Sequence, residues 1–133
     1  MNIFRALLAI QCIYTLLTAI WPLADIESFM AVTGYKIDVW LVKTVGALLV
    51  SIALCMGTHL FIHTDHRPVV VLCITSAIGF ICIDFYYALN DVIRDIYMVD
   101  GCFQIVLLLA WCYIVAFRYK LIKAAGVTDV IVK

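Results

Sequence analysis

A carboxylate inside an apolar run is the clearest candidate for chemistry in this sequence. Asp84 lies in "FICIDFYYALND", residues 80–91, among hydrophobic and aromatic side chains. On insertion scales a charge at the centre of a bilayer costs about 2.5–3.5 kcal/mol, so such residues usually face the protein interior and have a partner there. An aspartate stem is also too short to bring its charge to the headgroups. A polar partner is therefore expected on another helix.

Lys43 is the expected partner, because it lies three residues beyond Trp40 and should have a similar depth. Asp100 begins the last apolar run on the same side, where the positive end of a helix dipole favours a carboxylate. The sequence predicts an outward-opening pocket, flanked by Trp40, whose lining residues are Lys43, Asp84, Tyr87, Asp100 and Gln104.

Three interpretations of this cluster stay open. Lys43 can extend to the headgroups while Asp84 pairs with it only to fix the helix packing. The cluster can instead bind the polar end of an amphiphile, or take part in proton or ion movement. No catalytic residue is assigned, and no cofactor is predicted other than a lipid or quinone that such a pocket could bind.

Metal and thiol chemistry have weaker signals. His59 and His63 are four residues apart, a spacing that can hold zinc on a helix. Histidines at a membrane boundary are also ordinary polar edge residues, so no metal site is predicted and these two remain weak candidates. The six cysteines include no C-x-x-C pair, and most are expected to pack as small apolar residues. Neither G-x-S-x-G nor a phosphate loop is present.

The elements that must position these residues are membrane helices. The chain has 133 residues, 67% apolar and 14% charged, whereas a typical globular domain is about 45–50% apolar and about 25% charged. Lipid must therefore be part of its solvent. A spanning helix needs about 20 mostly apolar residues, and the uncharged runs predict four spans, at about 4–22, 40–62, 69–89 and 98–118.

The predicted fold is all-α: an integral membrane four-helix antiparallel bundle over residues 1–123, followed by a short cytoplasmic tail at 124–133. The first span is expected to be an uncleaved helix, because it is longer than the apolar region of a signal peptide. The linker between the first two spans predicts a short interfacial helix, capped by Asp25 or Ser28 and ended by Gly34. The short linker "HTDHRP" predicts a tight hairpin of the second and third helices.

Small and weakly polar residues recur at helical spacing in three spans and are expected to mark the buried faces. They are Gln11, Thr15 and Thr18 in the first span; Thr44, Ala47, Ser51, Cys55 and Thr58 in the second; and Thr75, Gly79 and Cys82 in the third.

Basic residues are concentrated on one side of the predicted membrane, as the cytoplasmic side requires. The other side has only Lys36 and Arg94, with Lys43 if it is counted there. We therefore expect an inner-membrane, multi-pass protein with both termini in the cytoplasm. The formal net charge is zero, so nothing suggests a nucleic-acid partner. The basic residues on the cytoplasmic side are Arg5, Arg67, Arg118, Lys120, Lys123 and Lys133.

Two stretches carry a resemblance to a known family. They are "VTGYKIDVWLVKTVGALLVSIALCM" and "ITSAIGFICIDFYYALNDVIRDIYMVDGCFQ". They resemble a group of small bacterial four-helix membrane proteins, similar in layout to DoxX-like proteins, over most of residues 30–112. That resemblance implies a link to membrane oxidoreductase complexes and quinone chemistry, and it assigns no catalytic residue here.

The first functional hypothesis is a non-enzymatic protein that binds a lipid, quinone or other amphiphile at the outer-leaflet cluster. The second is an accessory or scaffold subunit of a membrane redox complex, in which the cluster is only structural. The third is a small transporter that would work as a homodimer.

Overall fold

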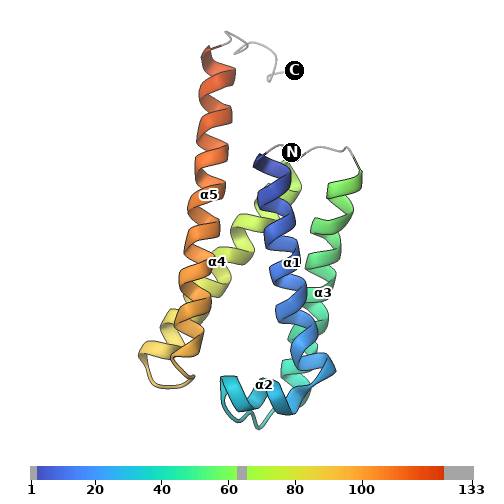
Figure 1. Cartoon of the computed structure of the whole chain (residues 1–133). Helices are drawn as coiled ribbons and strands as arrows, with labels where there is room; N and C mark the ends of the chain where they lie inside the picture. The colour runs from blue at the N-terminus through green and yellow to red at the C-terminus, as the bar shows by residue number, and fades with distance from the viewer. Residues whose placement is uncertain (1–2, 63–65, 125–133) are drawn as a thin grey trace.

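The computed structural model describes residues 3–62 and 66–124, and every secondary-structure element in this part of the chain is a helix (Figure 1). Four helices are long and apolar enough to cross a membrane, the last one as far as Phe117. The predicted all-α fold, with four helices able to span a membrane, is thus confirmed. Of the predicted tail at 124–133, Ala124 belongs to the last helix, and residues 125–133 lie outside the described residues. The helices are α1 (Ile3–Ala24), α2 (Ile26–Thr33), α3 (Val39–Phe61), α4 (Arg67–Leu89) and α5 (Ile96–Ala124).

The four long helices pack mainly as two pairs, α1 with α3 and α4 with α5, and the two pairs touch each other less. Figure 1 shows α4 and α5 inclined away from α1 and α3, with α2 below the ends of that pair. The predicted tight hairpin of residues 40–62 with 69–89 is wrong, because α3 packs along α1 and has few contacts with α4.

Small residues explain why α1 and α3 approach closely. Ala19 and Ala53 are fully buried between them, and the Cys12 thiol donates to the Ala53 carbonyl at 3.2 Å. A Cβ added at Gly46 would lie 3.0 Å from the Ala19 carbonyl oxygen. In lipid, such residues let helix backbones come together where larger side chains would hold them apart.

The polar stripes predicted to be buried have different outcomes. On α1, Gln11 and Thr15 are buried as predicted, but the stripes on α3 and α4 are exposed, so those two predictions are wrong. Their hydroxyls bond to their own helices, as Ser51 does to the Ala47 carbonyl at 3.3 Å, and therefore need no neighbour. The exposed members are Thr44, Ala47, Ser51, Cys55, Thr58, Thr75, Gly79 and Cys82.

The cysteines are also less buried than the sequence suggested. Cys73 is buried and Cys12 is partly buried, whereas the remaining four are exposed. The expectation of core packing therefore holds for these two only.

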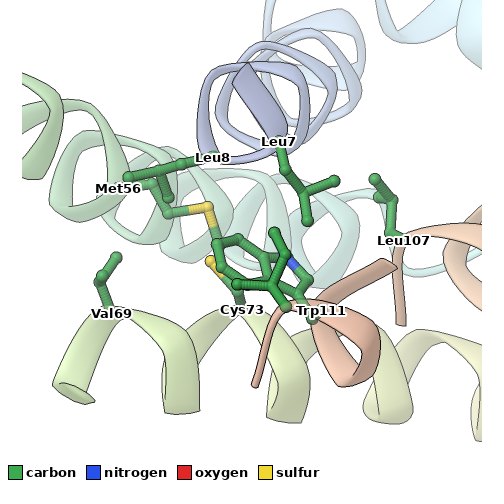
Figure 2. Packing of buried hydrophobic residues seen from close by; sticks show 8 residues of the cluster. Leu7, Leu8, Met56, Val69, Cys73, Leu107 and Trp111 are labelled. Atoms are coloured by element: carbon green, nitrogen blue, oxygen red, sulfur yellow. The ribbon is translucent and has the colours of Figure 1, made fainter. Parts of the chain in front are cut away.

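The apolar core lies toward the end of the molecule that holds the N-terminus (Figure 1). Trp111 is fully buried, and Figure 2 shows it among side chains of the other long helices. Its indole N–H donates to Gln11 Oε1 at 2.6 Å, and the Gln11 amide donates to the Cys73 carbonyl at 2.9 Å. These bonds join α1, α4 and α5 at this end. The cluster contains Leu7, Leu8, Met56, Val69, Cys73, Leu107, Trp111 and Ile114.

The short helix α2 begins and ends as its sequence predicts. Asp25 is the N-cap, and its Oδ1 accepts from the Ser28 backbone N–H at 3.1 Å. Gly34 ends the helix with φ of +93°, a conformation that glycine adopts without steric cost. The Trp21 indole N–H donates to the Ser28 hydroxyl at 2.9 Å, which ties α2 to the end of α1.

Candidate functional site

One candidate site is a cavity of about 420 Å³ between the two helix pairs, toward α2. Side chains of α1, α3, α4 and α5 line it, so it exists because the pairs separate at this end. Its polar part includes Asp84, Tyr87 and Asp100, all three of which belong to the predicted site. The apolar wall from α3 and α4 contains Leu41, Val42, Val45, Leu49, Phe80 and Ile83.

A second cavity, of about 370 Å³, lies between α1, α2 and α5. It shares four lining residues with the first, so the two cavities meet at these side chains. Asp100 therefore contacts both spaces. The shared residues are Thr18, Phe29, Tyr97 and Asp100.

Asp84 is buried although it is a carboxylate in an apolar helix. Only 3% of its surface is exposed, and its Oδ2 has no hydrogen-bond partner among the described residues. Gly101 permits the α5 backbone to lie against it, since a Cβ there would come 3.4 Å from Asp84 Cβ and 2.7 Å from Phe85 Cε2. The turn that carries Asp100 consequently packs onto Asp84.

The second carboxylate has partners. The Tyr14 hydroxyl donates to Asp100 Oδ1, and the side chains of Gln104 and Asp84 both interact with Asp100. Gln104 is 2% exposed, and its Oε1 has no hydrogen-bond partner in the described part of the chain. The site is thus built around two neighbouring carboxyl groups, one bonded and one not.

Tyr14 was missed by the sequence reasoning. It lies three residues after Gln11 and four before Thr18, on the stripe of α1 that was predicted to face the other helices. That spacing was a usable signal, but an aromatic residue in an apolar span is more often a packing residue.

Lys43 does not join the carboxylates. Its side chain is exposed and does not line the cavity, and no ion pair links it to Asp84 in the residues that the structure describes. The close packing of Gly46 on α1 fixes the rotation of α3, which brings Val42 and Val45 to the cavity and leaves Lys43 outside. Trp40 is 68% exposed and also lies outside the cavity lining.

Lys36 is the lysine at the cavity. Its ammonium group donates to the Thr33 carbonyl at 3.3 Å and lies 5.1 Å from the centroid of the Tyr97 ring. It belongs to the loop between α2 and α3, for which the sequence predicted only a linker.

The histidines lie away from the two carboxylates, near the start of α1. His59 Nε2 and His66 Nδ1 are 2.8 Å apart, and Phe4 packs on both rings. His63 lies outside the described residues. Within residues 3–62 and 66–124, no group of three or more potential ligands is placed to hold a metal ion.

No protein-family model, curated protein or solved structure matches this chain. The resemblance to DoxX-like proteins and the bacterial origin therefore have no support from these comparisons. Any function must be argued from the cavity and its residues.

Proposed function

We propose that this membrane protein binds a lipid, quinone or other small amphiphile between its two helix pairs, with Asp84 and Asp100 at the polar end of the ligand. The observation that carries the proposal is the Asp84 carboxylate, which lines the cavity, is almost fully buried and has an oxygen without a partner among the described residues.

The cavity has the properties expected of a small-molecule site. Such sites have volumes of about 300–1,000 Å³ and combine apolar walls with a few placed polar groups. Here about 420 Å³ is lined mostly by aliphatic and aromatic side chains, with the polar groups gathered around Asp84 and Asp100. A burial cost as large as that of an unpartnered carboxylate oxygen is more readily explained by a ligand than by helix packing.

We also propose how the protein is oriented in the membrane. Arg5 and Arg67 begin α1 and α4 at one end of the molecule, whereas Lys36 and Arg94 lie in loops at the other. Under the positive-inside rule, the first end would face the cytoplasm of an inner membrane. The cavity would then open into the outer leaflet, with α2 lying along the interface.

The test uses Asp84→Asn, with Lys43→Met as a control that changes a charged residue outside the cavity. The melting temperature of purified protein is measured with and without a lipid extract. Lipid should raise the melting temperature of the parent and of Lys43→Met, and should raise that of Asp84→Asn by less than half as much. Equal lipid protection in all three proteins would contradict the proposal.

A second candidate function has its own observation. The exposed small residues of α3 form a face that another membrane helix could approach closely. This favours an accessory subunit or a homodimer. Replacing Ala47 and Ser51 by leucine should then abolish cross-linking to a partner and leave the melting temperature of the isolated protein within a few degrees. Unchanged cross-linking would argue against this face. Its small members are Thr44, Ala47, Ser51, Cys55 and Thr58.

A further inference from the structure

Two side-chain oxygens that accept hydrogen bonds, and that have no donor among the described residues, lie where the two helix pairs separate. Asp84 Oδ2 and Gln104 Oε1 are both buried and have no hydrogen-bond partner among the described residues. A buried polar atom without a partner is costly to maintain, so a ligand that donates hydrogen bonds there would gain from satisfying it. Asp84 is one of the residues that line the cavity.

Three hydroxyl groups around the two cavities already donate hydrogen bonds within the protein. The Tyr14 hydroxyl donates to Asp100, and the Thr18 hydroxyl donates to the Tyr14 carbonyl at 3.0 Å. The Thr33 hydroxyl donates to the Phe29 carbonyl at 2.9 Å. An occupant would therefore meet groups that accept and few that can donate.

Two lining tyrosines and the Lys36 ammonium, which uses one of its three N–H groups on the Thr33 carbonyl, are the exceptions. No hydrogen bond joins the Tyr87 or Tyr97 hydroxyl to another described residue. Tyr87 is 39% exposed, so it lies at the edge of the cavity and not deep inside it. A phenol hydroxyl also accepts a hydrogen bond as readily as it donates one. These hydroxyls do not give the cavity a preference for an acceptor.

The charge balance points the same way. Asp84 is buried and interacts with Asp100, and two neighbouring carboxylates in buried surroundings are not stable as anions together unless a proton or a cation lies with them. Lys36 is the only basic residue among the described lining residues of the larger cavity. Its ammonium is already held by the Thr33 carbonyl and the Tyr97 ring. A second cation can be supplied by the ligand.

We infer that the polar end of the bound amphiphile is a cation with N–H groups, an alkylammonium that donates to Asp84 and Asp100. This inference rests on the proposed binding function and narrows its ligand class. The hydrocarbon tail lies along the apolar wall of α3 and α4, against Val42, Val45 and Ile83. A quinone presents carbonyl oxygens, and a phosphate or carboxylate presents negatively charged oxygens. Each of these head groups would place hydrogen-bond acceptors against the carboxylate oxygens of Asp84 and Asp100, with no proton to share.

The experiment compares head groups on one tail. The full-length protein is placed in nanodiscs of phosphatidylcholine and titrated with decylamine, decanol, decyl phosphate and a decyl-substituted benzoquinone. The matched variants are Asp84→Asn and Asp91→Asn, which make the same change inside and outside the cavity. Asp91 is exposed with φ of 56°, a conformation that asparagine accepts. Binding is followed by the melting temperature and by tryptophan fluorescence.

Decylamine should bind saturably and at least tenfold more tightly than the other three probes. Asp84→Asn should weaken it at least tenfold, and Asp91→Asn should change it less than twofold. Equal binding of decylamine to the parent and to Asp84→Asn would mean partition into the bilayer and would overturn the inference. Saturable binding of the quinone or the phosphate in preference to the amine would also overturn it, while leaving the binding function in place. If no probe saturates the parent, both the inference and the proposed function fail.

A second variant covers the case in which Asp84→Asn does not fold. Val42→Trp fills the apolar wall and leaves both acids unchanged. It should reduce decylamine binding at least tenfold, and unchanged binding would contradict the inference.

Discussion

At the scale of single residues, the site depends on a hydroxyl that holds one carboxylate and leaves the other free. The Tyr14 hydroxyl donates to Asp100 across the gap between α1 and α5. Asp84 has no equivalent donor for its Oδ2 among the described residues. Two acids with the same chemistry are therefore placed in different surroundings, one with a hydrogen-bond donor and one with an oxygen that has none among the described residues.

The contribution of this hydroxyl can be measured with Tyr14→Phe. Hydrogen bonds to charged groups are worth about 1.5–3 kcal/mol, so the free energy of unfolding should fall by about that amount in a reversible denaturant titration. Tyr113→Phe is the control, because Tyr113 is 66% exposed and its stacking on Phe117 does not need the hydroxyl. Equal effects of both changes would mean that the bond to Asp100 contributes nothing.

A titratable group outside the spans gives a pH-dependent prediction. The backbone and side chain of Ser28 donate hydrogen bonds that hold the pKa of the Asp25 carboxyl below its usual range. A lowered pKa means that the cap stabilises α2 fully above the ordinary aspartate pKa of about 3.9 and is lost as the pH falls through the folded value. Trp21 fluorescence should report this loss as the pH is lowered through that range, because its indole bonds to Ser28.

Asp25→Asn keeps a capping oxygen but cannot titrate. It should remove most of the pH dependence of this fluorescence change. Persistence of the change in Asp25→Asn would assign it to another group.

At the scale of the helices, α4 and α5 can pack closely because Gly101 has no side chain. A Cβ there would lie 2.7 Å from Phe85 Cε2, which is closer than two carbon atoms can approach. A Cβ added at Gly79, on the exposed side of α4, would meet no neighbouring atom within 4 Å among the described residues. The two glycines therefore have different reasons to be present.

Gly101→Ala should destabilise the protein by about 1–3 kcal/mol, as overpacking of a close contact does. Gly79→Ala should cause no loss, because alanine meets nothing there and is the better helix former. Both are read from denaturant titrations of the purified protein. A result in which the two substitutions have the same effect would show that α4 and α5 do not approach this closely.

At the scale of the whole molecule, the two helix pairs are joined at one end and separated at the other. The Trp111–Gln11–Cys73 hydrogen bonds and the surrounding apolar cluster join them near the N-terminus. Toward α2 the pairs diverge, and the two cavities occupy the space between them. A ligand entering from the membrane would meet this open end.

Gln11→Met tests that connection. It keeps the approximate volume but leaves the buried Trp111 N–H without a partner, at a cost of about 1–3 kcal/mol. The melting temperature should fall, and the control Ser51→Ala should change it little, because that exposed hydroxyl bonds only within α3. If Gln11→Met has the same melting temperature as the parent protein, the hydrogen bonds of Gln11 do not hold the two helix pairs together.

The sequence by itself determined what each segment is. Charged residues bound the four apolar runs, and a run of that length in lipid must be a helix, because its backbone polar groups can only be satisfied internally. Asp25 and Gly34 bounded α2 in the same local way. Asp84 and Tyr87 are neighbours on one helix, so their shared face also followed from spacing alone.

Only the tertiary structure decided which faces meet. Gly46 and Ala47 are adjacent small residues, and both could have been the contact with α1, but they point in directions about 100° apart on the helix. The structure uses Gly46, which places Lys43 outside and leaves Asp84 beside Asp100 and not beside the predicted Lys43. Rotation about a helix axis is set by the sum of many contacts from other helices, and no single stretch of the sequence contains that sum.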